Sequence, residues 1–368
     1  MIVHARRFLL LLGLAVAATL FVGCNSPDSL PPILYLRADA AGRIHLYRQD
    51  AAAEAEPQQL SGQGAGEVVD FAAVPDGRRV IYTVSSDPGG ALRIVNRDGD
   101  GDRELLACPD AECSGPVWSP DGARVVYERR PLAANGTFGS PRLYWLDPVD
   151  GATLPLVVGE VIGYGVRFSP DGAWLSYVSP GDAGVVLYHL ADGRQRLLSS
   201  RVGRPAAFSP DSAQVIVSDL VLEGNPTAPD DDTPAPVQES SRVFLYWVSL
   251  TEEGRERLSA ELPVDDSAPA WSPDGEWIAF GRAPADVASG RQLWLMRPDG
   301  SEARALTNDP NLFHGPPTWS PDGTTLLYQR FDLTDPAATP EVWLLRLADS
   351  VPTRIAPNGY LPAWLPTD

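Results

Sequence analysis

The sequence predicts an all-β protein that folds as a single β-propeller with seven four-stranded blades, six being the alternative count. Three observations support this prediction: a repeated turn phrase, the spacing of its copies, and incomplete repeats at the two ends of the chain. The repeat phrase is best preserved as Trp271-Ser272-Pro273-Asp274-Gly275. Whole or altered copies occupy residues 74–77, 118–122, 168–172, 208–212 and 319–323.

The repeat phrase has the chemistry of a tight turn between two strands. Proline sets φ near −65° at the second turn position, aspartate can bond nearby backbone amides, and glycine takes the positive φ that starts the next strand. An aromatic residue ends the strand before most copies, and an apolar, β-rich run follows each one. We therefore assign a structural turn role to the phrase aspartates, which are Asp76, Asp121, Asp171, Asp211, Asp274 and Asp322.

The spacing of the copies indicates the architecture. Their prolines lie at positions 75, 120, 170, 210, 273 and 321, so the intervals are 45, 50, 40, 63 and 48 residues. Short strands repeated at intervals of about 40–50 residues are typical of propellers and similar arrays. Each interval holds four strand-like segments, the last two usually joined by an Asp-Gly-like hairpin turn such as Asp192-Gly193.

The two ends of the chain are incomplete in complementary ways. Segments 33–36, 44–47 and 58–60 look like second, third and fourth strands without a first, whereas segment 360–364 looks like a first strand alone. Pairing of these ends would complete a seventh blade and leave no blade-to-blade interface exposed. Six blades are the alternative if the ends do not pair.

The first residues predict export. Arg6 and Arg7 precede an apolar run at 8–22, which is shorter than the about 20 residues of a membrane-spanning helix. The run ends at Gly23-Cys24 and resembles the lipobox of bacterial lipoproteins, in which the cysteine is lipidated. This resemblance implies a signal peptide at 1–23, a tether at 24–32 and a lipid anchor on the outer side of a bacterial membrane; an ordinary secretory signal is the alternative.

The composition narrows the function classes. The chain has no lysine, so its 29 basic residues are all arginine, which excludes a Schiff-base lysine and a P-loop lysine. Without the leader, 27 arginines face 48 acidic residues, a net charge of −21. This charge repels nucleic acids and anionic lipid headgroups. We expect no nucleic-acid partner, no cofactor and a monomer.

Two short segments have local chemistry of their own. Cys108 and Cys113 could close a small disulfide loop in an oxidising compartment, worth about 2 kcal/mol, the alternative being two free thiols. The segment 98–102 alternates aspartate and glycine, but an EF-hand needs glycine sixth and glutamate twelfth, where this chain has Arg103 and Pro109. We expect an elaborated hairpin turn there, and no metal site.

The repeats resemble the WD40-like repeat of the TolB-type β-propeller family. The aromatic-Ser-Pro-Asp-Gly phrases and the strand end Leu306-Thr307 carry this resemblance over residues 33–366. The resemblance implies the propeller fold. Related propeller peptidases carry a hydrolase domain after the blades, and no Gly-x-Ser-x-Gly elbow occurs here. Similar oligogalacturonate lyases use a histidine-rich metal site, whereas the mature chain has only His45, His189 and His314.

Candidate binding residues lie in the loops that lead into each first strand, because propellers usually bind at one face and at the channel mouth. The loop 308–316 is the richest in polar and aromatic groups. Our candidates are Asp309, Asn311, Phe313, His314, Asp265, Asp266, Arg201, Arg204 and Tyr164, the alternative being ordinary surface loops. The acidic, proline-rich insertion at 223–241, between the second and third strands of the fourth repeat, is a further candidate for partner docking.

Two classes of function remain from the sequence. The first is an extracytoplasmic, membrane-anchored binding or scaffolding module for a protein, peptide or glycan. The second is a carbohydrate-active hydrolase or lyase whose carboxylates, Asp265, Asp266 and Asp309, meet at the channel mouth. We favour binding because the sequence shows no nucleophile–base pair and no metal-ligand pattern.

Overall fold

The computed structural model describes residues 30–52, 55–62, 66–86, 89–157, 161–223, 240–259, 263–285 and 289–367. Every regular element in this part of the chain is a β-strand, which confirms the predicted all-β fold class. The predicted signal peptide, Cys24 and most of the tether lie outside these residues. No helix among the described residues has the length and apolarity needed to cross a membrane.

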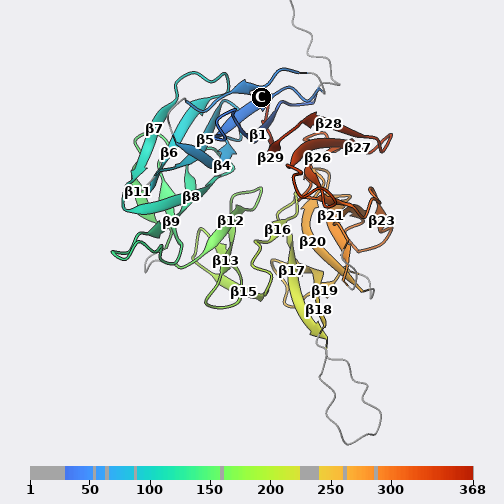
Figure 1. The fold of residues 1–368 in the computed structure, drawn as a ribbon. Helices are drawn as coiled ribbons and strands as arrows, with labels where there is room; N and C mark the ends of the chain where they lie inside the picture. Colours follow the sequence, from blue (N-terminus) through green and yellow to red (C-terminus); the bar gives the residue numbers. More distant parts are fainter. Residues whose placement is uncertain are drawn as a thin grey trace, which may run out of the picture. The chain divides into compact units, whose positions relative to one another are not determined.

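Seven antiparallel sheets form the blades of a propeller, arranged around a central axis (Figure 1). The first blade combines the two ends of the chain: β29 (Gly359–Trp364), β1 (Ile33–Ala38), β2 (Ile44–Gln49) and β3 (Gln58–Gln59). In the second to fourth blades the strands follow the chain order. The second blade holds β4 (Glu67–Ala73), β5 (Arg79–Ser85), β6 (Gly90–Asn96) and β7 (Arg103–Cys108), and the third holds β8 (Ala111–Trp118), β9 (Val125–Pro131), β10 (Arg142–Leu146) and β11 (Thr153–Pro155). The fourth blade holds β12 (Tyr164–Phe168), β13 (Trp174–Ser179), β14 (Gly184–His189) and β15 (Gln195–Ser199).

The fifth to seventh blades repeat this order, and the first strand of the seventh blade is divided in two. The fifth blade holds β16 (Ala207–Phe208), β17 (Gln214–Glu223), β18 (Ser240–Ser249) and β19 (Glu256–Arg257). The sixth holds β20 (Val264–Trp271), β21 (Ile278–Pro284), β22 (Gln292–Met296) and β23 (Arg304–Ala305). The seventh holds β24 (Leu312–His314) and β25 (Thr318–Trp319), which together form its first strand, followed by β26 (Thr325–Asp332), β27 (Glu341–Arg346) and β28 (Pro352–Ala356). The insertion joins β17 to β18, and its residues 224–239 lie outside the described part of the chain.

The predicted closure of the ring is confirmed. Strand β29 pairs with β1 in antiparallel register, with Ile33 opposite Trp364 and Leu36 opposite Tyr360. The C-terminal segment therefore supplies the first strand of a blade whose other three strands come from the N-terminal side. In Figure 1, β29 and β1 lie side by side although they are at opposite ends of the sequence.

The repeat phrase forms the turn that its residues predict. Ser119 Oγ donates to Asp121 Oδ1 at 2.6 Å and accepts from Arg124 N at 3.0 Å. The same serine–aspartate bond recurs in the fourth to seventh blades, at Ser169–Asp171, Ser209–Asp211, Ser272–Asp274 and Ser320–Asp322. The serine bond is the largest reason why the pKa of Asp121 lies below its ordinary value. The turn is thus held by side-chain bonds as well as by backbone geometry.

The phrase tryptophans also join the blades, which the sequence analysis did not anticipate. Trp319 Nε1 donates to Ala270 O of the preceding blade at 2.9 Å, and Trp118 Nε1 donates to Ala72 O at 3.1 Å. Trp271 and Trp364 make the equivalent bonds to Ala207 O and Thr318 O. Each tryptophan therefore packs its ring between two blades while its N–H is satisfied by the neighbour.

The antiparallel order within the blades defines two faces of the propeller. The phrase turns and the turns between third and fourth strands lie at one end, which we call the turn face. The connections between blades and the loops between second and third strands lie at the other end, which we call the connection face. The sequence-derived candidate loops and the ends of β17 and β18 that flank the insertion belong to the connection face.

Candidate functional site: the central channel

Seven structurally equivalent residues line the central channel. Each lies three positions before the phrase aromatic, or before Ala73 in the second blade, which occupies the same place. We call this set the channel ring; its members are Asp70, Gly115, Gly165, Pro205, Ala268, Pro316 and Leu361. A cavity of about 300 Å³ is lined by Asp70, Gly115, Gly165 and Leu361. A second cavity, of about 610 Å³, is lined by Pro205, Ala268 and Pro316. Arg167 lines both cavities.

Four members of the channel ring adopt a left-handed backbone conformation. Gly115, Gly165, Ala268 and Leu361 have φ values of 60°, 66°, 53° and 50°. At each of them the first strand bulges, because the pairing register with its neighbour skips this residue and the next one. A bulge leaves the skipped N–H without a ladder partner. Alanine and leucine tolerate this conformation less readily than glycine, so Ala268 and Leu361 are strained positions.

Side chains from the preceding blade satisfy three of these freed N–H groups. Asp70 Oδ2 accepts from Gly115 N at 2.6 Å, and Glu128 Oε1 accepts from Gly165 N at 2.7 Å. Gln329 Oε1 accepts from Leu361 N at 3.1 Å. Hydrogen bonds to carboxylate and amide oxygens therefore join neighbouring blades along the channel wall.

The smaller cavity contains charged groups whose pKa values are displaced. Burial raises the pKa of Asp70 and the pKa of Glu128 above their ordinary values, and the backbone bonds to Gly115 and Gly165 oppose the shift. The Arg167 side chain is exposed to the channel, but the surrounding blades lower its pKa by desolvation. An arginine remains charged at neutral pH despite such a shift.

Arg167 is the cation at the junction of the two cavities. Its guanidinium donates to Val166 O at 3.0 Å, and it forms no ion pair with a carboxylate of the described residues. Glu128 acts on it only through its longer-range charge. Asp70, Glu128 and Arg167 are not among the residues that the sequence singled out. The available signal was the alignment of the repeats, which places Asp70 where the other repeats have glycine, proline, alanine or leucine.

The sequence-derived residues of the seventh blade do not form an exposed loop. Phe313 and His314 belong to strand β24, with Phe313 opposite Phe331 and His314 opposite Arg330. His314 is only 2% exposed, and its Nδ1–H donates to Arg291 O at 2.8 Å. Burial lowers the pKa of His314 to about 4. The expectation of a loop was wrong because cross-strand pairing, which sequence alone does not show, extends the first strand here.

Phe313 has aromatic and cationic neighbours within the protein. Its ring stacks on Phe331 with centroids 4.9 Å apart, and the Arg291 guanidinium lies 5.0 Å from its centroid. Asp309 and Asn311 remain exposed, and Asp309 Oδ1 accepts from Asn311 N at 3.0 Å as in a local turn. Only the outer part of the predicted loop is therefore available on the surface.

The three sequence-derived carboxylates have separate structural roles and do not line either cavity. Asp266 is fully buried and binds Arg282 through both oxygens, at 2.6 and 2.8 Å. Asp265 Oδ1 accepts from Val243 N at 2.8 Å. The expectation that these carboxylates meet Asp309 at the channel mouth therefore does not describe the channel, whose acidic groups are Asp70 and Glu128.

The remaining sequence-derived candidates lie around the fourth and fifth blades. Arg204 is exposed and lines the larger cavity. Arg201 is also exposed, and its N–H donates to Asp219 Oδ1 at 3.0 Å. Tyr164 Oη donates to Gly203 O at 3.4 Å. Burial, followed by the charge of Arg204, lowers the pKa of Arg291, so these two arginines lie near each other.

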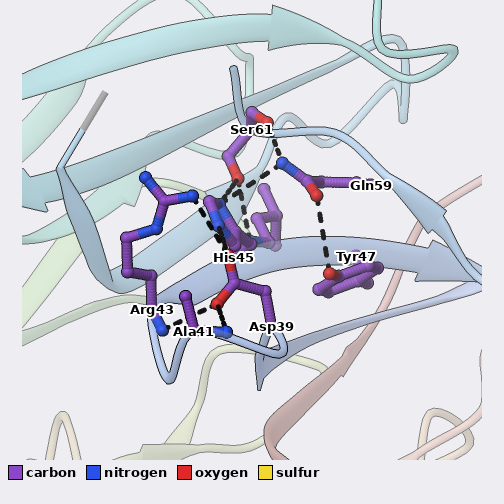
Figure 2. A network of polar contacts seen from close by, with 8 residues as sticks. Asp39, Ala41, Arg43, His45, Tyr47, Gln59 and Ser61 are labelled. Carbon is purple, nitrogen blue, oxygen red and sulfur yellow. Dashed lines mark hydrogen bonds and ion pairs between the residues drawn. The ribbon is translucent and has the colours of Figure 1, made fainter. Parts of the chain in front are cut away.

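A Ser–His–Asp arrangement occurs in the first blade, and Figure 2 shows its contacts. His45 Nδ1 lies 3.3 Å from Ser61 Oγ, and His45 Nε2 lies 3.2 Å from Asp39 Oδ2. Gln59 Nε2 also contacts His45 Nδ1, at 3.3 Å. These are the residue types of a hydrolase triad, brought together by the pairing of β2 with β1 and with β3.

The position of Ser61 gives this network a structural role. Ser61 is 4% exposed, and its hydroxyl accepts from Leu46 N at 3.1 Å. The equivalent bonds recur at Ser259, which accepts from Leu245 N, and at Thr307, which accepts from Leu293 N. The same hydroxyl contact therefore holds the outer strand to the third strand in three blades, and this structural role accounts for Ser61 without catalysis.

Two local expectations can be compared with the structure. Cys108 and Cys113 are joined by a disulfide, between the last strand of the second blade and the first strand of the third. The segment 98–102 connects β6 to β7 as a turn, in which Asp98 Oδ1 accepts from Asp100 N at 3.1 Å. Within the described ranges, no cluster of three or more histidine, cysteine or acidic side chains could hold a metal ion.

Comparisons with known proteins bear on the fold. No family model matches the sequence. The uncharacterized peptidase YuxL of Bacillus subtilis is 26% identical over an alignment of 189 residues that covers 45% of this chain and 28% of that protein. The chain therefore matches much less than two thirds of this relative's length.

Solved structures of propeller proteins are similar in fold at low sequence identity. TolB from Acinetobacter baumannii has a TM-score of 0.52 and 16% identity, over 91% of this chain and 82% of that one. TolB from Agrobacterium tumefaciens has a TM-score of 0.50 and 18% identity, over 72% and 94%. An oligogalacturonate lyase from Vibrio parahaemolyticus has a TM-score of 0.58 and 13% identity, over 90% and 86%. In fold, this chain is a seven-bladed β-propeller that is similar to the propellers of these TolB structures.

Proposed function

We propose that this protein is a non-catalytic recognition module, displayed outside the cytoplasm and anchored through Cys24, whose ligand enters the central channel from the connection face. The observation that carries the proposal is the channel itself. Two cavities, of about 300 and 610 Å³, meet at an arginine without a carboxylate partner among the described residues. Volumes of this size are typical of sites for small ligands or for the end of a chain segment.

The polar constellations outside the channel support binding over catalysis. Asp266 is neutralised by Arg282, and Ser61 performs the same structural task as Ser259 and Thr307. The ligand class is a protein, a peptide or a glycan. The net charge of the chain disfavours nucleic acid.

Affinity capture from membrane extracts of the native cells tests this proposal. Ala207 lines the larger cavity, so Ala207→Phe should fill it and abolish capture of a partner that the unmodified protein retains. Val149→Ser is the matched control, because Val149 is 77% exposed in a hairpin on the turn face. Val149→Ser should retain the partner, and capture that survives in Ala207→Phe would contradict binding at the channel.

One observation favours a second candidate function, a carbohydrate-active hydrolase or lyase. Asp70 and Glu128 are paired acidic groups in the smaller cavity, and the charge of Asp70 contributes to the raised pKa of Glu128. A carboxyl group whose pKa is raised by burial has the chemistry of a general acid. Release of reducing sugars by the purified protein, abolished by Glu128→Gln, would establish this activity and contradict the non-catalytic proposal.

A further inference from the structure

We propose that the larger cavity binds a ligand with a carboxylate and an otherwise apolar body, and that this carboxylate bonds to Ala268 N as Glu128 bonds to Gly165 N. The inference rests on the proposed function, since it specifies the ligand of the channel. It follows from a comparison of four blade junctions, of which three supply a side-chain acceptor to the bulge N–H and one, at Ala268, does not.

Three junctions contain their own acceptor for the bulge N–H. Asp70 supplies it to Gly115, Glu128 to Gly165, and Gln329 to Leu361. Glu128 and Gln329 occupy the same place in their second strands, directly after the buried Tyr127 and Tyr328. A carboxylate or amide oxygen at this position is therefore a repeated feature of the channel wall.

The junction between the fifth and sixth blades has no such acceptor. Ala268 has the same left-handed φ, and the register of β20 and β21 skips it in the same way. The equivalent position in the fifth blade is Ser218, whose side chain is two atoms shorter than that of glutamine or glutamate. No side chain in the described part of the chain accepts a bond from Ala268 N, and the larger cavity opens at both residues.

The cations that line the larger cavity indicate an anionic acceptor. Arg167 and Arg204 both line it, and the structure gives Arg167 no carboxylate partner among the described residues. A guanidinium and a backbone N–H that converge on one carboxylate form charge-assisted bonds, which are stronger than neutral ones. A carboxylate would also offset the cost of desolvating Arg167 within the channel.

Apart from Arg167, Arg204 and Ser218, the polar side chains of the larger cavity are already engaged within the blades. Trp271 Nε1 donates to Ala207 O, Ser272 Oγ to Asp274 Oδ1, and Thr318 Oγ1 to Leu327 O. Most of the remaining lining is apolar: Phe168, Pro170, Pro205, Ala206, Ala207, Phe208, Pro210, Ala268, Pro269, Ala270, Pro273, Pro316 and Pro317. A sugar would leave most of its hydroxyl groups without partners there, whereas an apolar body loses nothing on entry.

Two sources can supply such a carboxylate: the C-terminus of an apolar peptide and a free monocarboxylic acid. The probes are N-acetyl-trialanine with a free carboxylate, hexanoate, and the corresponding amides, with binding measured by saturation-transfer NMR and calorimetry. We expect at least one acid to bind, and its amide to bind at least tenfold more weakly. Tighter binding of the peptide acid identifies a chain terminus, and tighter binding of hexanoate identifies a free acid. Equal binding of acid and amide, or no binding of either acid, would overturn the inference.

A substitution at Ser218 provides a sharper test, because the protein itself contains the matched designs. Ser218→Glu copies Glu128, and Ser218→Gln copies Gln329, so either side chain should bond to Ala268 N and occupy the carboxylate site. Both variants should lose at least tenfold in probe affinity while unfolding at the same or a higher temperature. Using two variants guards against misfolding of one of them.

Charge removal supplies the second arm of the test. Arg167→Met should weaken acid binding at least tenfold, whereas Arg129→Met should leave it unchanged, since Arg129 pairs with Asp110 outside the cavity. Retention of full affinity in folded Ser218→Glu and Ser218→Gln would refute the assigned site. If these tests fail while Ala207→Phe still abolishes partner capture, the channel-binding proposal stands without a carboxylate ligand. If the acids bind as expected but capture survives Ala207→Phe, the proposed function fails instead.

Discussion

Glu128 Oε1 in the third blade accepts a hydrogen bond from Gly165 N in the fourth, at 2.7 Å. The bond exists because the bulge in β12 turns this N–H away from its own sheet. It joins two blades at the wall of the channel and satisfies a donor that would otherwise be costly to leave unpaired. The stability of the ring and the chemistry of the channel therefore depend on the same side chains.

Removal of this acceptor should destabilise the protein. Glu128→Ala should lower the free energy of unfolding by about 1–3 kcal/mol, because Gly165 N would lose its partner. Glu128→Gln keeps an acceptor and removes a charge that burial disfavours, as the raised pKa of Glu128 indicates, so it should be close to neutral. Urea denaturation at pH 7 measures both variants, and equal losses would show that the hydrogen bond contributes little.

Deletion of residues 358–368 should prevent the ring from closing. The truncation removes β29, including the Trp364 Nε1 bond to Thr318 O and the pairing with β1. Two blade faces would be exposed to water, so we expect severe loss of stability and aggregation. Thermal unfolding and light scattering test this expectation. A truncated chain that melts like the full chain would contradict the importance of closure.

Two buried tyrosines should respond differently to loss of the hydroxyl. Tyr82 Oη donates to Asp102 Oδ1 at 2.7 Å, so Tyr82→Phe should cost about 1.5–3 kcal/mol. Tyr328 Oη is buried without a hydrogen-bond partner among the described residues, so Tyr328→Phe should be neutral or stabilising. Chemical denaturation of the two variants gives the comparison directly, and a larger loss for Tyr328→Phe would show that its hydroxyl has a bound partner such as water.

Buried His314 should make stability sensitive to mild acid. Burial lowers its pKa to about 4, whereas the unfolded chain takes up a proton near pH 6.5. The stability that neutral His314 contributes is complete above pH 6.5 and is lost as the pH falls toward 4. At pH 5 the loss in the free energy of unfolding is about 2 kcal/mol. The wild type should therefore lose more stability between pH 7.5 and pH 5 than His314→Gln, whose side chain does not titrate. Parallel profiles for the two proteins would contradict this prediction.

The double substitution Phe313→Ala and His314→Ala should be costly. An exposed loop would tolerate it within about 0.5 kcal/mol. Phe313 instead stacks on Phe331, and His314 is buried, so a loss on the order of 3 kcal/mol is expected. Thermal denaturation of the double variant distinguishes the two cases. Loss of ligand binding in this variant should then be interpreted only after correction for folding.

The fold followed from the sequence because turn chemistry is local. Proline, aspartate and glycine in the repeat phrase are constrained by backbone geometry within five residues, and the spacing of the copies counts the blades. The missing strands at the two ends predicted the pairing of β29 with β1, because an incomplete blade leaves unpaired edges. The inter-blade bonds of Trp118 and Trp319 were not apparent, since each depends on a carbonyl about 46–49 residues earlier in the chain.

Which residues line the channel became apparent only from the tertiary structure. In the sequence Asp70, Glu128 and Arg167 belong to three separate repeats and share no local motif. The packing of consecutive blades brings these side chains to one cavity, and the bulges determine which backbone N–H groups face a neighbouring side chain. Likewise, His314 looks like a loop residue until pairing with Arg330 buries it. Local sequence determines turns and strands, whereas burial, pKa and the convergence of side chains depend on contacts between paired strands and between blades, which arise only in the folded chain.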